Sequence, residues 1–542
     1  MIFGLTGLWH DSSLAPMRNG FASIIRRFAS FPLRTSIESA GEISRLVGWP
    51  TLAFVAGIFL AAVLVSQAQE SVEPDVLPSL AEPSSSAESL PSTSAEPLPA
   101  SSQSLPSIAP EPLPSSAPSL PSSEEAFPSS NDPWSSSTNY TAAQTNAIPP
   151  PRAAGPYGSV DNKNVFVGEA IPSGESRRFH YHLQLTVRGV WDDNIFISHT
   201  NRVSDYYFAI EPEITIGFGD IEGRSSSYFR LDYMPSAILF VDHSDEDAFN
   251  QLIHLEGGYN SGRLRLSLSE DIALLESANL NSISDTTGLW ANLDASGPTR
   301  VNIFNTRLRA DYDLTGKVFL QGEFDSSIYF YPNRISSYLV SGGLYIYYNW
   351  LPKLSVGIGG TFGYDWVDDP TPNQTFEQVN ARLNYQATSK FNLYASAGVE
   401  FRQFDNDQGD HTTPVFEVGA TYHPFDGTNL TLAAGRRIYN SGFLADQDFA
   451  DTYVVARFQQ RLFRRVYLGL ACGYENSDYF AAREGVSAPR NDDYWFIEPS
   501  VDVLITRWLS AGAYYLHRDD SSSIDFFSFY DNQVGVRATV RF

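Results

Sequence analysis

The segment Phe179-His-Tyr-His-Leu-Gln-Leu-Thr-Val-Arg188 shows the pattern from which the architecture follows. Its apolar residues, among them Leu183 and Val187, alternate with polar residues at a period of two. This period predicts a β-strand with one apolar and one polar face, because successive side chains of a strand point to opposite sides. The same alternation recurs up to Gln533–Phe542. We therefore expect an all-β region from Phe179 to Phe542.

The connections between these segments alternate in length. Short ones contain turn residues, such as Asn260-Ser-Gly262 and Leu314-Thr-Gly316, whereas the others are mostly longer and rich in Asp, such as Asp405–Asp410. Short turns at one end and long loops at the other are typical of an up-and-down antiparallel β-barrel that spans a membrane. Counting the connections predicts about 18 strands, within a range of about 16 to 18.

The composition of the strands separates a membrane barrel from a soluble sandwich. Lys is nearly absent from them, and many positions on the polar face are Ser, Thr, Gly, Asn, Gln, Arg or Asp, which suit a water-filled lumen. Aromatic residues gather near strand ends, for example at Tyr206–Phe208 and Tyr329–Tyr331. Aromatic rings favour the boundary between hydrocarbon and headgroups, so we interpret these clusters as interfacial girdles.

Overall composition excludes several other classes of protein. The chain has 542 residues, a net charge of −26, 13% aromatic residues and a single cysteine, Cys472. One cysteine excludes a disulfide scaffold and a cysteine-based zinc site. The acidic balance argues against binding to nucleic acid. Only one long apolar run is present, which argues against a multi-span helical membrane protein.

That apolar run, Leu52–Val65, follows several arginines and precedes a small-residue site ending at Ala68. We interpret residues 1–68 as a secretory signal peptide with a long basic region or a start at Met17; an uncleaved anchor is the alternative. Residues 69–150 are rich in Ser and Pro and are expected to form a disordered periplasmic linker, either a spacer or a tether. A lead-in segment, 151–178, would then precede the barrel at 179–542.

A more specific pattern follows the first strand. Gly189-Val-Trp-Asp-Asp-Asn-Ile-Phe196 resembles a strand-to-loop motif of an uncharacterised family of porin-type bacterial outer-membrane β-barrel proteins, some of which occur with exopolysaccharide gene clusters. On this resemblance Asp192, Asp193, Asn194 and Phe196 are the family-like positions. The final strand resembles the C-terminal segment that the barrel-assembly machinery reads, with Phe542 as the signal.

The polar face supplies candidate lumen-lining residues of both charge signs. Arg263, Arg265, Arg307 and Arg309 are expected to lie side by side near the short turns of two neighbouring strands. Such a stripe facing acids would set up a field across the lumen; mutual neutralisation in an ionic network is the alternative. The full set is Arg188, Arg263, Arg265, Arg307, Arg309, Arg382, Glu211, Glu213, Glu323, Asp325, Glu498 and Asp502.

The sequence contains few residue patterns that indicate catalysis or a resident metal. His180 and His182 share a face without a third ligand nearby in sequence, and Cys472 lies on the apolar face. We expect no enzyme activity, no cofactor and no dedicated metal site. The Asp-rich loops could bind Ca²⁺ or Mg²⁺ weakly and bridge to lipopolysaccharide phosphates, although ordinary turn chemistry also explains them.

The sequence thus predicts a passive outer-membrane channel for small hydrophilic solutes or oligosaccharides, embedded in outer-membrane lipid. An exopolysaccharide export or assembly barrel is one alternative, in which lumen aromatics such as Tyr345 and Tyr347 would stack on sugars. A structural anchor with a plugged lumen is the other. Substrate, direction of transport and oligomeric state stay open at this stage.

Overall fold

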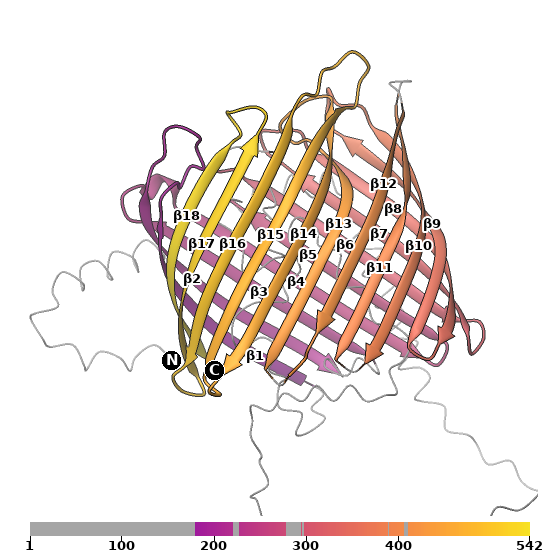
Figure 1. Cartoon of the computed structure of the whole chain (residues 1–542), viewed down its shortest axis with the longest axis horizontal. Helices are drawn as coiled ribbons and strands as arrows, with labels where there is room; N and C mark the ends of the chain where they lie inside the picture. The colour runs from indigo at the N-terminus through magenta and orange to yellow at the C-terminus, as the bar shows by residue number, and fades with distance from the viewer. Residues whose placement is uncertain are drawn as a thin grey trace, which may run out of the picture. The chain divides into compact units, whose positions relative to one another are not determined.

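The computed structural model describes residues 179–219, 227–277, 294, 297–388, 390–405, 410–425 and 427–542. These residues form one 18-stranded antiparallel sheet in which each strand pairs with its sequence neighbours. The last strand returns to pair with the first, so the sheet closes into a barrel (Figure 1). The expected strand number is confirmed. The expected signal peptide, linker and lead-in segment lie outside the described residues.

The strands have closely similar lengths. They are β1 (Phe179–Asp192), β2 (Asp205–Gly219), β3 (Tyr228–Phe240), β4 (Ala248–Ser261), β5 (Leu264–Leu275), β6 (Val301–Asp313), β7 (Val318–Phe330), β8 (Ser337–Leu351), β9 (Leu354–Val367), β10 (Gln374–Thr388), β11 (Phe391–Phe404), β12 (Asp410–Tyr422), β13 (Thr428–Asn440), β14 (Gln447–Leu462), β15 (Val466–Ala481), β16 (Asn491–Leu504), β17 (Leu509–Ser522) and β18 (Phe529–Arg541).

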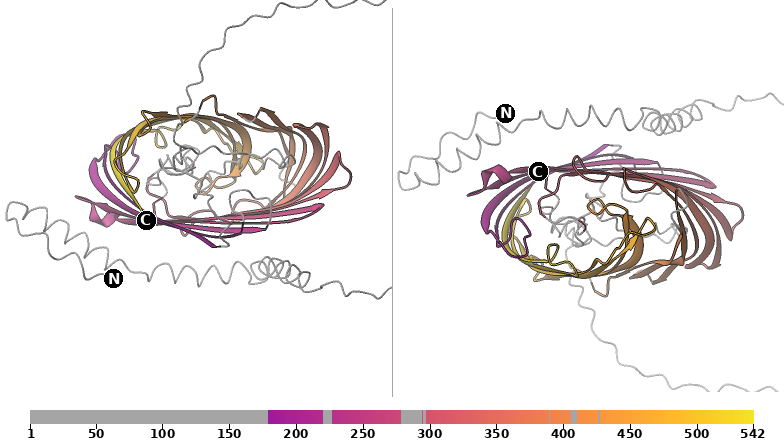
Figure 2. Two further views of the ribbon diagram at one scale, coloured as in Figure 1. Left: turned by 90° about the horizontal axis from the view of Figure 1, so that it is seen from below. Right: turned by 90° about the horizontal axis from the view of Figure 1, so that it is seen from above.

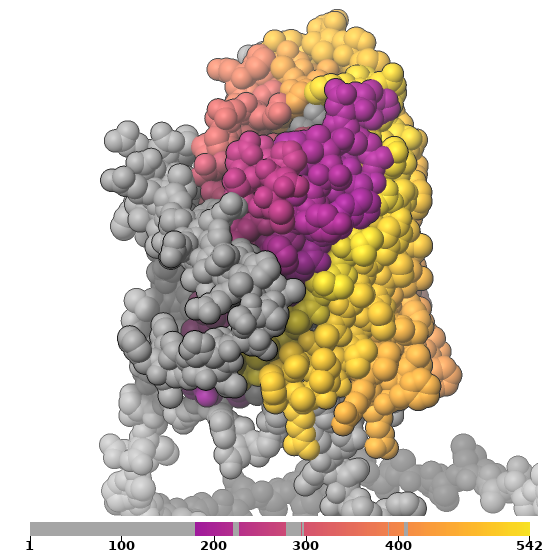
Figure 3. All heavy atoms as spheres, turned by 90° about the vertical axis from the view of Figure 1, so that its left-hand side faces the viewer, coloured from indigo at the N-terminus to yellow at the C-terminus, as the bar shows by residue number. Residues whose placement is uncertain are grey.

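Closure places the two ends of the β-region side by side. Gln184 of β1 is opposite Arg541 of β18, and the register runs without a break to Asp192 opposite Gln533. Figure 3 shows the N-terminal strands in purple beside the C-terminal strands in yellow. The short turns gather at one end of the barrel, the turn end, and the long loops at the other, the loop end, because neighbouring strands are antiparallel.

The two faces of the wall differ as the alternation predicts. On β8, Leu344 and Ile346 are 63% and 48% exposed, whereas Tyr345 and Tyr347 between them are 0% and 2% exposed. Apolar side chains therefore cover the outside of the wall, and the alternate positions point inward. Among the described residues, no helix is long and apolar enough to cross a membrane.

Part of the interior is filled by apolar side chains. Seen along the barrel, the wall has an oval outline (Figure 2). Inward residues of β14, β16, β17, β18 and β1 to β4 form one buried apolar cluster, which includes Val455, Phe496 and Leu516. Ile195 and Ile197 of the β1–β2 loop join this cluster and are each 2% exposed. We call this region the filled part of the lumen.

Candidate functional site

The rest of the interior holds a polar cavity of about 330 Å³. Its lining comes from every strand between β5 and β15, from Ser269 on β5 to Glu475 on β15. Most strands contribute alternate, inward-pointing residues, and most of these carry charged, hydroxyl or amide groups. We call this region the open part of the lumen and treat the cavity as the candidate site.

At mid-height, ion pairs cross from strand to strand. Arg307 Nε on β6 lies 2.8 Å from Asp325 Oδ1 on β7, and Arg309 Nε lies 3.2 Å from Glu323 Oε1. Arg382 on β10 donates from Nη1 and Nη2 to the two oxygens of Glu323, at 2.8 and 2.9 Å. The Arg382 guanidinium also lies 3.4 Å from the centre of the Tyr345 ring. Each arginine here is thus compensated by a carboxylate rather than free to present its charge.

A second set of pairs lies nearer the loop end. Arg402 on β11 donates from Nε to Glu400 at 2.8 Å and lies 3.7 Å from Asp448 on β14. Arg437 on β13 lies 3.3 Å from Glu417 on β12. Arg402 and Asp448 are 2% and 0% exposed at their side chains, so these charges are held away from bulk water by their partners.

Carboxylates outnumber guanidinium groups in the lining. Asp365, Asp451 and Glu475 each keep a buried carboxylate oxygen that has no hydrogen-bond partner among the described residues. An unpaired carboxylate favours a cation nearby. The lining arginines are Arg307, Arg309, Arg382, Arg402, Arg436 and Arg437; the lining acids are Asp271, Asp294, Glu323, Asp325, Asp365, Glu400, Glu417, Asp451 and Glu475.

At the loop end the cavity is covered by loops that bind one another. Asp294, from the long β5–β6 connection, accepts hydrogen bonds from Ser441 Oγ at 2.8 Å, Phe443 N at 3.0 Å and Tyr479 OH at 3.0 Å. Arg490 donates to the Asp294 carbonyl at 2.9 Å. Burial acts to lower the pKa of Arg490, but Tyr479, Asp492 and Asp294 outweigh it and hold that pKa above its ordinary value. We call Asp294, Ser441 and Arg490 the loop hub.

The β13–β14 loop extends the hub to the opposite wall. Ile335 N, in the β7–β8 loop, donates to Gly442 O at 3.1 Å, and Asp446 N donates to Thr371 Oγ1 in the β9–β10 loop at 2.9 Å. The Arg334 guanidinium lies 4.2 Å from the centre of the Phe443 ring. Segments far apart around the wall are therefore joined above the cavity, which restricts access from the loop end.

The structure divides the sequence-predicted residues between three settings. Arg307, Arg309, Arg382, Glu323 and Asp325 line the cavity. Arg263 lies in the β4–β5 turn, while Arg265 is paired with Asp313 at 2.8 Å.

The remaining predicted residues lie outside the cavity lining. Arg188 pairs with Glu211 at 2.5 Å and donates to Tyr514 OH at 3.3 Å, and Gln184 donates to Glu213 at 2.9 Å. Asp502 pairs with Arg537 at 2.6 Å, and Glu498 is 5% exposed.

Sequence reasoning missed Asp294, Asp365, Asp451 and Glu475. Alternation alone could have placed the last three on the polar face, because each lies within a strand. No local signal marks Asp294, whose partners are distant in sequence.

The Asp-Asp-Asn motif forms a clasp at the closing strands. Asn194 donates from Nδ2 to Tyr530 O at 2.9 Å and to Ser198 O at 3.0 Å, and Asp193 accepts from Asn532 N at 2.8 Å. These bonds tie the β1–β2 loop to β18 and hold it where Ile195 and Ile197 enter the filled part. The motif thus has a structural role here.

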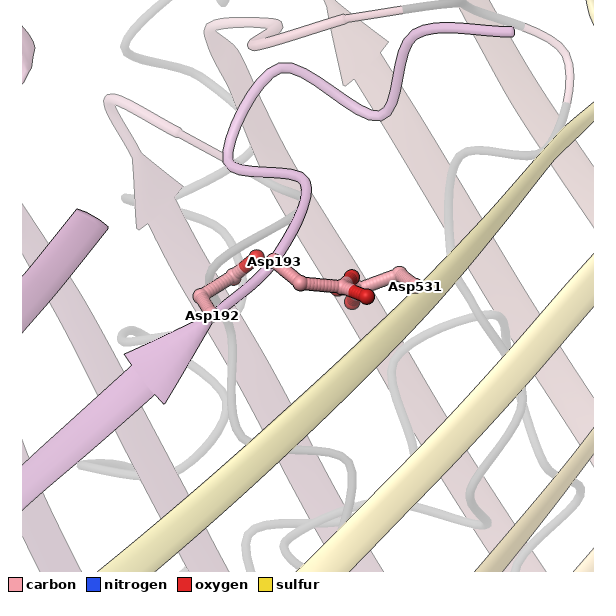
Figure 4. Close-up of side chains that lie close together, drawn as sticks. All are labelled: Asp192, Asp193 and Asp531. Atoms are coloured by element: carbon pink, nitrogen blue, oxygen red, sulfur yellow. The ribbon is translucent and has the colours of Figure 1, made fainter. Parts of the chain in front are cut away.

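Three acids of this clasp come within 4.8 Å of one another: Asp192, Asp193 and Asp531 (Figure 4). Most of their oxygens accept bonds from protein donors: Gln533 donates to Asp192 at 2.9 Å and Arg518 donates to Asp531 Oδ2 at 2.6 Å, while Asp531 Oδ1 has no hydrogen-bond partner among the described residues. Burial acts to raise the pKa of Asp193, but hydrogen bonds from Arg202 and Asn532 outweigh it and hold that pKa below its ordinary value. The group is therefore better described as a hydrogen-bonded clasp than as a cation site.

No family model matches the chain, and no curated protein matches it. Solved structures that resemble it include OpdO of Pseudomonas aeruginosa, with a TM-score of 0.36 and 11% identity over 67% of this chain and 97% of that one. OccAB3 of Acinetobacter baumannii gives 0.34 and 10%, over 67% and 99%. The outer membrane protein OpdK of P. aeruginosa gives 0.35 and 10%, over 67% and 98%. The likeness is weak in sequence and in TM-score, and the barrel architecture rests on its own strand pairing.

Proposed function

We propose that this protein is a bacterial outer-membrane channel that lets small hydrophilic solutes pass without a chemical step. One observation carries the proposal: a polar cavity lies inside a closed wall whose outside is apolar. A closed barrel satisfies the backbone hydrogen bonds of its strands within itself, which lipid demands. A barrel of this size is also wide enough to leave an aqueous path.

The charge of the cavity favours cationic or amine-bearing solutes. Five of its six arginines, all but Arg436, have an acid at ion-pair distance. By contrast, Asp365, Asp451 and Glu475 each keep a carboxylate oxygen without a hydrogen-bond partner among the described residues. A low-dielectric wall strengthens the field of such groups and raises the local concentration of cations. The pairing of the lumen arginines with acids supports an ionic network, which was the alternative to the basic stripe.

The same proposal places the parts of the chain. We propose a periplasmic location for the N-terminal linker and contact between the Asp-rich loops and lipopolysaccharide. Phe542, whose side chain is 74% exposed and whose N donates to Leu183 O at 2.9 Å, would be the residue read by the barrel-assembly machinery.

Planar-bilayer recording of the refolded full chain tests the proposal. We expect discrete conductance in KCl and a reversal potential in a KCl gradient that favours K⁺. Asp451→Asn with Glu475→Gln should reduce this preference. Asp502→Asn is the matched control, because Asp502 is paired with Arg537 outside the cavity lining and should leave the preference unchanged. Absence of conductance would overturn the channel; a Cl⁻ preference would overturn the choice of cations.

The export alternative makes a different prediction. Its sugar-stacking aromatics are covered here, since Tyr345 lies under Arg382 and Tyr347 stacks on Phe319 with ring centres 4.7 Å apart. Loss of secreted polysaccharide on gene deletion, with unchanged uptake of small solutes, would nevertheless favour export over the channel.

A further inference from the structure

The pairing of β12 with β13 is incomplete. The two strands pair only from Phe416 opposite Arg436 to Tyr422 opposite Leu430, at the turn end. Toward the loop end, residues 410–415 have a strand partner on the β11 side but none on the β13 side among the described residues. Figure 1 shows the two strands diverging in this direction. We call this interval, between 411–415 of β12 and 437–440 of β13, the seam.

The seam arises because the β13–β14 hairpin leaves the line of the wall. β13 keeps its full pairing with β14 up to Asn440 opposite Asp448. The loop beyond it binds Asp294 and the backbone of Ile335, both of which belong to loops from other parts of the barrel. β12 meanwhile stays paired with β11 in the wall. The hairpin is thus held toward the lumen by the loop hub, and β12 is not.

The cavity lies beside this seam. In a strand that is paired on both sides, alternate residues face the lumen. Here consecutive residues line the cavity: Val415, Phe416 and Glu417 on β12, and 436–440 on β13. Consecutive residues also line the cavity on β6, which is paired on both sides, so it is the missing ladder beyond Phe416 that places the seam beside the cavity.

Side chains rather than backbone hydrogen bonds close the seam. Val415 and Ile438 are 8% and 7% exposed, and the ring of His411 stacks on Phe480 of β15 with centres 3.8 Å apart. Backbone left without strand partners at membrane depth is tolerated where it lines a water-filled cavity. Strands held in this way separate more easily than strands joined by a hydrogen-bonded ladder, because only contacts between side chains have to be broken.

Arg436 lies at the point where the pairing stops. Its Nη1 donates to Thr452 Oγ1 at 2.9 Å, and its Nε has no hydrogen-bond partner among the described residues. No carboxylate pairs with it among the described ion pairs, unlike Arg437 beside it. A guanidinium with donors to spare binds carboxylates strongly. A binding group for an acidic head and an apolar path thus lie next to each other at the seam.

We propose that the seam is a lateral passage for single-chain amphiphiles with an acidic head, such as long-chain fatty acids. Arg436 shares the outward face of β13 with Leu432 but lines the cavity beside the seam, so the head would bind it there. The chain would pass between Val415 and Ile438 into the bilayer. This passage rests on the membrane location proposed above but not on solute flow through the lumen.

Bridging the seam tests the passage. If the register of Phe416 and Arg436 continued, Pro414 would lie opposite Ile438. Cysteines at both positions, in a Cys472→Ala background, can be joined by a short bifunctional reagent. The control is Val418→Cys with Ala434→Cys, a pair already opposite each other in the closed part. Both bridged proteins should keep their KCl conductance, which separates this test from that of the channel.

The readout is photolabelling of the full chain in vesicles by a C16 fatty acid that carries a diazirine. We expect labels on the seam residues Val415 and Ile438, lost when the seam is bridged and retained in the control. Arg436→Gln should reduce labelling by the acid about tenfold, the loss of one bond to a charged group, and leave labelling by the matching C16 alcohol unchanged. Labels confined to outward residues such as Leu432, or seam labels that survive bridging, would overturn the proposal.

Discussion

The filled and open parts of the lumen share one wall and one alternating pattern, yet their interiors differ. In the filled part, inward positions carry residues such as Val455 and Phe496, and the β1–β2 loop adds Ile195 and Ile197. In the open part, inward charges such as Arg382 and Glu323 line the cavity, whereas inward charges on the strands of the filled part, such as Arg188, are paired outside it. Apolar side chains exclude water and pack, whereas charges keep water and space between them. The side chains therefore divide the lumen into a packed, filled part and an open part with space for water.

Removing a large side chain from the filled part should have the largest effect on stability. Phe496 is 1% exposed within the apolar cluster, so Phe496→Ala leaves a cavity and should lower the free energy of unfolding by about 4 kcal/mol. Phe362→Ala is the control, because Phe362 is 56% exposed on the outer face. Urea unfolding in detergent micelles measures both. Equal effects would contradict the division, as would a change in ion preference in Phe496→Ala.

Breaking the loop hub should affect the open part instead. Asp294→Asn weakens hydrogen bonds from Ser441, Phe443 and Tyr479 that depend on its charge. A loss of about 2 kcal/mol would raise the population of released loops more than tenfold. We expect larger or more frequent conductance steps, with little change in unfolding of the barrel. Unchanged single-channel records would show that the hub does not restrict the path.

The architecture could be predicted from the sequence because its cause is local. Alternation in Phe179–Arg188 is enough to set two faces, and alternating loop lengths are enough to count strands. The division of the lumen is a different matter. Whether Arg309 is free or paired depends on Glu323 lying opposite it on the next strand. Alternation assigns a face to each residue, but the partner of a charge is set by register.

Long-range loop contacts were even less accessible to sequence reasoning. Asp294 binds Ser441 and Arg490, both more than a hundred positions away along the chain. The inward turn of the β13–β14 hairpin depends on such contacts, so the seam beside β12 has no local signature either. The Asp-Asp-Asn motif is visible in the sequence as a pattern. Its structural role depends on β18, whose backbone it binds and which is distant along the chain.

The clasp on the filled part should give the smallest effect, and one that depends on pH. The folded pKa of Asp193 is held below its ordinary value, so its bonds stabilise the fold above the unfolded pKa and are lost as the pH falls through the folded pKa. Asp193→Asn should therefore cost about 1 kcal/mol at neutral pH and close to nothing once the pH has fallen below the folded pKa. The control is Asp525→Asn, because Asp525 is exposed. This variant makes the same change of charge but leaves the clasp intact. Urea unfolding of the wild type and both variants across this range measures the difference. A cost for Asp193→Asn that persists in acid would show that packing of the loop, rather than the carboxylate, fastens it to β18.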